Sequence, residues 1–139
     1  MSREGGEALA RELGASGAFQ SCDVRDRGQV EALLASAVER FGRLDVLVNN
    51  AGGALPGRAP EGDPQAWLDL FALNVHSIFY ACRAAIPVLR RGGGGASVET
   101  ASVSGLLADY GLGPSTPPRA PWCTTPARWR STAAATGSA

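Results

Sequence analysis

Apolar residues recur at helical spacing between residues 26 and 41 and then give way to a short apolar run. A helix over 26–41 places one apolar stripe on a single face, and Gly42 follows it as a stop signal. The stripe consists of Val30, Leu33, Leu34, Ala37, Val38 and Phe41. The next run, 44–49, is rich in Val and Leu, which predicts a parallel strand covered on both faces. A polar helix over 2–13 and a short strand over 18–22 are predicted before these elements.

A longer helix is predicted after residue 63. Asp63 is a natural N-cap, Pro64 suits the first helical position, and the helical pattern continues to about Arg91, with Pro87 weakening its last turns. The glycines at 92–95 end this helix, and 96–101 has the pattern of another strand. The alternation of helices and strands predicts an α/β fold with a parallel sheet wound by helices.

The last part of the chain differs from the rest in composition. Residues 115–139 hold three arginines, no acidic residue and four of the nine prolines, and they show neither a helical nor a strand period. We therefore predict a domain over 1–114 and an irregular, disordered tail over 115–139.

Charge and cysteine content narrow the classes of function. The 139 residues carry 13 basic and 13 acidic side chains, and every basic residue is Arg. Balanced charge argues against a nucleic-acid binder, and the absence of Lys excludes lysine chemistry. The three cysteines (Cys22, Cys82 and Cys123) indicate neither a disulfide framework nor a metal site, and no apolar run reaches the roughly 20 residues of a membrane span. We expect a cytoplasmic protein without membrane contact.

Polar residues stand where each predicted strand ends. Asp23 follows the first strand, Asn49 and Asn50 come at the end of the second, and Ser102 and Ser104 follow the third. Ligands of parallel sheets bind at the carboxyl ends of the strands, which favours a dinucleotide site there.

Four segments, in this order, resemble motifs of the short-chain dehydrogenases/reductases. They are Asp23-Val24, Asn49-Asn50-Ala51-Gly52, Leu73-Asn74-Val75 and Ser102-Val103-Ser104-Gly105. The resemblance implies a partial Rossmann-type doubly wound sheet and hydride transfer between NAD or NADP and a small carbonyl or alcohol substrate. It also implies that Asp23, Val24 and residues 49–52 contact the cofactor, that Asn74 and Ser102 are catalytic, and that no metal takes part. In many relatives the long helix lies at a subunit interface, which implies a homo-oligomer.

The resemblance fails at two points. The family's catalytic tyrosine and lysine would fall at positions 115 and 119, which hold Ser115 and Arg119, and the glycine-rich phosphate turn is not found. We therefore expect an inactive fragment that begins after the family's second strand. One added base in the codon of residue 115 is compatible with Y-x-x-x-K at these positions, so we hypothesise a frameshift after Pro114.

Structural roles are the alternatives for the same residues. Asp23 could cap the following helix, Asn49 and Asn50 could form an ordinary turn, and Asn74 could make a buried hydrogen bond to a neighbouring strand. Ser102 could satisfy local backbone groups. For the whole chain, the alternatives are part of an active reductase, a poorly folding product, or a non-catalytic module that pairs with an intact homologue through the helix after Pro64. The substrate and the choice between NAD and NADP are not encoded in these motifs.

Overall fold

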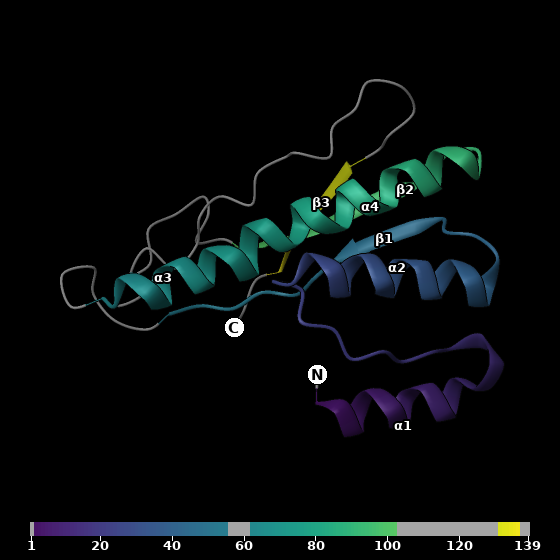
Figure 1. The fold of residues 1–139 in the computed structure, drawn as a ribbon, viewed down its shortest axis with the longest axis horizontal. Coiled ribbons are helices and arrows are strands. Elements are labelled where there is room, and N and C mark those ends of the chain that lie inside the picture. The colour runs from purple at the N-terminus through teal and green to yellow at the C-terminus, as the bar shows by residue number, and fades with distance from the viewer. Residues whose placement is uncertain (1, 56–61, 103–130, 137–139) are drawn as a thin grey trace.

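The computed structural model describes residues 2–55, 62–102 and 131–136. The main elements are α1 (Arg3–Leu13), α2 (Arg27–Phe41), β1 (Val46–Asn49), α3 (Pro64–Phe71), α4 (Ser77–Arg91), β2 (Ala96–Ser102) and β3 (Ser131–Thr136). A 3-10 turn, Gly14–Ser16, follows α1, and a π-helical turn, Ala72–His76, joins α3 to α4. Helices α2 and α4 contact each other and α4 also contacts β1, whereas α1 lies apart from them (Figure 1).

Local capping signals explain the ends of the first two helices. The Ser2 side chain accepts a hydrogen bond from the Gly5 amide at the start of α1, and the Asp26 side chain accepts from two amides at the start of α2. Gly42 ends α2 with a left-handed φ of 80° that a residue with a side chain rarely adopts. The helices predicted over 2–13 and 26–41 are confirmed.

The long helix after Asp63 begins as predicted but is not continuous. The Asp63 carboxylate caps α3, Pro64 occupies its first turn, and Pro87 is accommodated inside α4. Between the two helices, the π-helical turn Ala72–His76 inserts a residue, and the Ser77 hydroxyl donates to the Leu73 carbonyl oxygen at 2.6 Å. Helical spacing alone did not predict this turn, whose Asn74 makes hydrogen bonds to Gly53 in the loop after β1.

The three strands form a parallel sheet in the order β1-β2-β3. Strand β2 agrees with the strand predicted over 96–101, and β1 is shorter than predicted. The prediction of an irregular tail is wrong for Ser131–Thr136, which form β3 along β2. The unpaired backbone groups at a sheet edge favour such pairing even for an alanine-rich segment. The other tail residues, 115–130 and 137–139, lie outside the described residues.

The strand predicted over 18–22 is wrong. These residues are extended between α1 and α2, but no described segment runs beside them to complete a ladder. Phe19 instead packs over Gly6, where an added Cβ would collide with the ring. A strand needs a hydrogen-bonded neighbour, which a sequence pattern does not supply.

The core lies between one face of the sheet and the helices α2 and α4. Val30 and Leu34 of α2 meet Ala85 and Leu89 of α4, and Leu47 of β1 packs against this cluster. The opposite face of β1 is open among the described residues, because Val46 and Val48 are 51% and 60% exposed. The predicted burial of this strand on both faces is therefore wrong here.

Two expectations from composition need revision. Cys22 is a free thiol whose pKa is raised by burial, whereas Cys82 is disulfide-bonded, which the cysteine pattern did not predict. The helical stretch Pro64–Arg91 is long and apolar enough to cross a membrane by length and composition alone. Its Asn74 and Ser77 are buried in the fold and its apolar residues pack against α2 and β1, as in the core helix of a globular domain.

Candidate functional site

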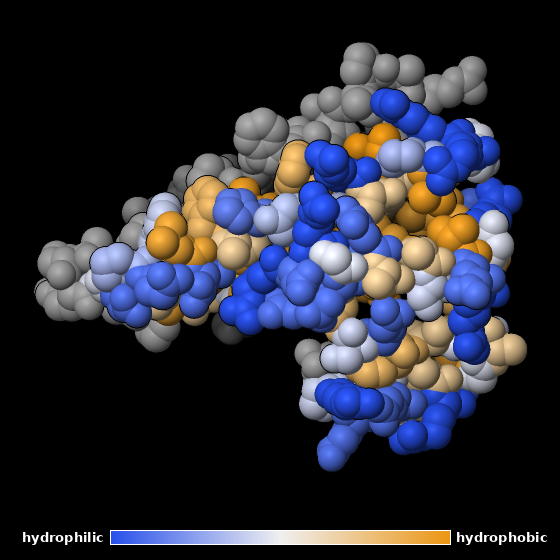
Figure 2. Space-filling view, viewed as in Figure 1, coloured by the Kyte–Doolittle hydropathy of each residue, from blue (hydrophilic) through white to orange (hydrophobic). Residues whose placement is uncertain are grey.

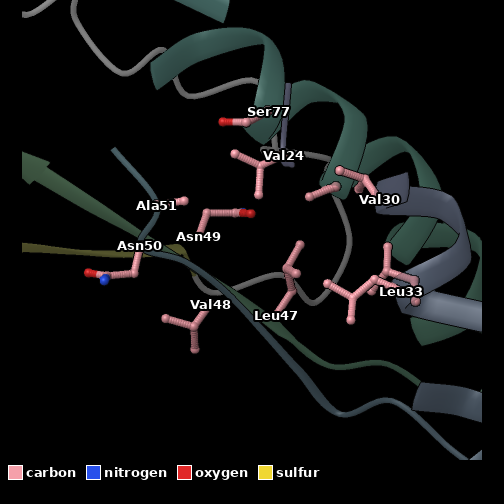
Figure 3. Close-up of a pocket in the computed structure, with 11 residues that line it drawn as sticks. Val24, Val30, Leu33, Leu47, Val48, Asn49, Asn50, Ala51 and Ser77 are labelled. Carbon is pink, nitrogen blue, oxygen red and sulfur yellow. The ribbon is translucent and has the colours of Figure 1, made fainter. Parts of the chain in front are cut away.

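A cavity of about 110 Å³ lies where α2, β1 and α4 meet. Val24 and the residues Asn49, Asn50 and Ala51 line it together with apolar side chains of α2 (Figure 3). The helix α4 adds Ser77 and Ala81. Two segments that the sequence analysis assigned to a cofactor are thus brought together around one cavity, although the 24 residues 25–48 lie between them in sequence.

Asp23 directly precedes the cavity residue Val24 in sequence and is fixed by Arg25. The Arg25 side chain donates to both carboxylate oxygens, with Nη2 to Oδ2 at 2.7 Å, and the Arg25 amide donates to Oδ1 at 3.0 Å. These bonds lower the pKa of Asp23 to about 2. The alternative that Asp23 caps the following helix is wrong, because Asp26 is the N-cap of α2.

The two asparagines at the end of β1 are each held by β2. The Asn49 Nδ2 atom donates to Oε1 of Glu99 at 3.3 Å, and the Thr100 hydroxyl donates to Oδ1 of Asn50 at 2.9 Å. Glu99 and Thr100 are successive residues of a strand, so they act from opposite faces of the sheet. The turn after β1 is therefore fixed from both faces by its neighbouring strand.

Asn74 connects the loop after β1 to the π-helical turn. The Gly53 amide donates to Asn74 Oδ1, and Asn74 Nδ2 donates to the Gly53 carbonyl oxygen, both at 2.9 Å. Asn74 is only 2% exposed, so these bonds satisfy amide groups that water does not reach. An added Cβ on Gly53 would lie 3.2 Å from Leu73 Cδ2, so glycine suits this close approach. From the sequence, a buried hydrogen bond to a neighbouring strand was the alternative for Asn74; the side chain does make hydrogen bonds, but its partner Gly53 lies in the loop after β1 rather than in a strand.

The remaining predicted residues lie at the ends of their strands. Gly52 follows the cavity residue Ala51 and is exposed, and Ser102 is the last residue of β2, in register with Thr136 of β3. Residues 103–105 of the serine motif, and Ser115 and Arg119, lie outside the described residues. Ser102 is not one of the residues that line the 110 Å³ cavity.

Sequence reasoning missed the residues that support the site. Glu99 and Thr100 lie in a strand, and Ser77 lies in a helix, so none stands at a strand end where ligand groups are expected. A charged residue in the otherwise uncharged strand 96–102 was the one signal that could have singled out Glu99.

Comparison with known proteins gives a consistent result. A family model described as short chain dehydrogenase matches residues 1–114. D-threitol dehydrogenase of Mycolicibacterium smegmatis is 39% identical over 111 residues, covering 78% of this chain and 43% of that protein. An uncharacterized NAD-dependent oxidoreductase of Mycobacterium tuberculosis is 36% identical over 111 residues, covering 79% of this chain and 37% of that protein.

A solved structure supports the same comparison at the level of the fold. A protein from Burkholderia xenovorans assigned to the short-chain dehydrogenases/reductases superposes with a TM-score of 0.66 and 40% sequence identity. The match covers 73% of this chain and 38% of that one. The chain therefore spans less than half the length of each of these three proteins.

Proposed function

Because this chain belongs to the short-chain dehydrogenase/reductase family of oxidoreductases, we propose that its described residues form the adenine end of an NAD- or NADP-binding site. The observation that carries the proposal is the cavity lined by Val24 and by Asn49, Asn50 and Ala51. A complete member of the family with these residues would interconvert a small alcohol and a carbonyl compound. D-threitol dehydrogenase, by its name, acts on such an alcohol.

The cavity fits one ring of the cofactor. Its volume of about 110 Å³ is well below the roughly 300–1,000 Å³ of pockets that enclose a drug-sized ligand. Val24 and Ala51 offer apolar contacts to the faces of a ring, and Asn49 offers a polar group. The Asp23 carboxylate beside them would accept a hydrogen bond from an amino group. Among the described residues, no glycine-rich turn precedes a helix where a pyrophosphate would bind.

The bound nicotinamide supplies the hydride chemistry in this family. Of the chain's own residues, Ser102 would donate a hydrogen bond to the substrate oxygen, and Asn74 holds the loop at Gly53 in place. A proton donor of adjusted pKa is also required. Positions 115 and 119 hold Ser115 and Arg119, and the sequence contains no Lys. Arg differs from Lys in shape and remains charged, so it does not replace that lysine. We propose that this chain binds nucleotide without catalysing hydride transfer.

Two measurements test this function. In an NMR titration with AMP, we expect the largest shifts at the amides of Val24, Asn49 and Ala51, whereas shifts confined to other segments would refute the site. In a spectrophotometric assay of NADH and NADPH oxidation with carbonyl substrates, we expect no turnover. Turnover that the Ser102→Ala substitution abolishes would show that the chain is an active enzyme.

A second candidate is a non-catalytic module that pairs with an intact relative. It is favoured by the exposed apolar residues Trp67, Leu68 and Phe79 on α3 and α4, which are 39%, 54% and 48% exposed. Figure 2 shows hydrophobic residues at the surface over α3. A row of ring contacts runs along the same helices, from Trp67 to Phe71, Phe71 to His76 and His76 to Tyr80, with centroids 5.3, 5.5 and 6.3 Å apart.

Co-expression with an intact relative tests this second candidate. A mixed oligomer on size-exclusion chromatography, lost on Leu68→Glu but kept on the exposed polar control Gln65→Glu, would favour pairing through α3. The same experiment on the chain alone reports whether it forms a homo-oligomer. We also propose a cytoplasmic location, which cell fractionation tests.

A further inference from the structure

Glu99 of β2 reaches the cavity indirectly, through Asn49 of β1. The two residues are direct partners in the parallel register of β1 and β2. Oε1 of Glu99 accepts hydrogen bonds from the Ser97 hydroxyl and from Asn49 Nδ2. Ser97 is itself 2% exposed, so its hydrogen bond to Glu99 is shielded from water.

This arrangement fixes the orientation of the Asn49 amide. An asparagine side chain presents a donor nitrogen on one side and an acceptor oxygen on the other, and its neighbours decide which way it faces. Because the nitrogen of Asn49 faces Glu99, its oxygen points away from Glu99. Figure 3 shows the Asn49 side chain extending from the end of β1 among the cavity residues, with oxygen at its tip. An amide oxygen has two lone pairs and can accept a ligand hydrogen bond in addition to others.

We propose that Glu99 is a positioning residue that turns the oxygen of Asn49 toward the cavity and so makes the cavity selective for a heterocycle with an amino group. The selectivity rests on the proposed function of the cavity as an adenine site. In chemical terms, the cavity prefers a 6-aminopurine over a purine without the amino group. Glu99 touches neither ligand and acts only through Asn49.

The test compares two nucleotides and three substitutions. AMP and the purine ribonucleoside monophosphate that lacks the 6-amino group are titrated by NMR into the full chain and its variants. Glu99→Leu removes the acceptor at similar size, Glu99→Asp withdraws it by one methylene, and Glu99→Gln keeps an oxygen that Asn49 can face. Glu39→Leu on α2 is the matched control, because Glu39 is exposed.

We expect wild-type protein, Glu99→Gln and the Glu39→Leu control to share the same preference for AMP. Glu99→Leu and Glu99→Asp should lower this preference by about fivefold, the effect of one net hydrogen bond. The readout is this change on substitution, because a hydrogen bond accepted by Asp23 would be common to every variant. Should Glu99→Leu fail to fold, the milder Glu99→Asp carries the same prediction.

The outcomes separate this inference from the proposed function. If both nucleotides bind and every Glu99 variant weakens them equally, Glu99 is only structural and the inference is refuted while the adenine site stands. If wild-type protein binds neither nucleotide, the adenine site is refuted and the selectivity with it. In that case, the side-chain amide signal of Asn49 in the free protein still tests whether Glu99 holds the Asn49 amide. The signal should shift in Glu99→Leu and stay close to wild type in Glu99→Gln.

Discussion

Asn74 and Gly53 are joined by two hydrogen bonds of 2.9 Å, one in each direction between the asparagine amide and the glycine backbone. The Asn74 side chain thus pairs with both backbone polar groups of Gly53, as the backbone of a neighbouring strand would. It ties the loop that follows the Asn49–Ala51 turn to the helical layer. The position of the cavity's polar wall therefore depends on a residue in the middle of a long helix.

Replacing Asn74 should cost more stability than its size suggests. Asn74→Ala removes two hydrogen bonds made by a side chain that is 2% exposed, so we expect a loss of about 1–3 kcal/mol in the free energy of unfolding. Urea denaturation followed by circular dichroism measures it. Asn50→Ala is the control, because Asn50 is exposed and should cost less than about 1 kcal/mol. Equal costs for the two variants would contradict the role assigned to Asn74.

The bond between Arg25 and Asp23 should be visible in a titration. The pKa of Asp23 is about 2 in the folded chain and 3.8 without its partners, so the carboxylate adds stability above pH 3.8. That contribution is lost as the pH falls from 3.8 through about 2. A carbon-detected NMR titration of the Asp23 carboxyl should give a midpoint near 2 and a clear upward shift in Arg25→Gln. Arg3→Gln, which removes an exposed Arg paired with Glu7, should leave the midpoint unchanged.

The exposed apolar face of β1 should make the chain bind hydrophobic dyes and self-associate. Exposed apolar strand residues bind hydrophobic dyes and promote association. The double substitution Val46→Thr and Val48→Thr should reduce dye fluorescence and light scattering, while changing the free energy of unfolding by less than about 1 kcal/mol. Leu47→Thr, on the covered face, should instead destabilise by about 2 kcal/mol or more. No change in dye binding in the double variant would mean that another surface causes it.

The frameshift hypothesis predicts a specific result at the level of DNA. Resequencing the gene should show one additional base in the codon of residue 115. The corrected frame should encode a tyrosine at position 115 and a lysine at position 119. A confirmed reading frame without a nearby lysine codon would refute the hypothesis. The lack of NADH oxidation proposed above would then be an inherited property of the chain.

Elements with local signals could be predicted from the sequence, and those that depend on distant partners could not. The starts of α1, α2 and α3 and the ends of α1 and α2 follow from local signals such as the caps Asp26 and Asp63, which lie next to the turns they stabilise. The strand expected over 18–22 depends on a neighbour. In a doubly wound sheet of order 3-2-1-4-5-6, the third strand pairs only with the second, which no described segment supplies.

The candidate site shows the same division. Asn49 was predicted because it follows an apolar segment, where the carboxyl ends of strands present polar groups, and Val24 because Asp23-Val24 resembles a motif of the family. Glu99 was missed because its contact with Asn49 arises from the register between β1 and β2, which places it opposite Asn49. The sequence therefore predicted residues that the structure brings around one cavity, whereas the structure was needed to find the residues that support them.

The π-helical turn also makes the relative rotation of α3 and α4 depend on the number of residues between them. Each residue advances an α-helix by about 100°, so the one inserted residue sets the rotational phase of α4 relative to α3. The ring row reflects this, since its steps are four, five and four residues, and the step of five, from Phe71 to His76, spans the turn. Deleting one residue between 72 and 76 would leave a helix intact but rotate one half against the other.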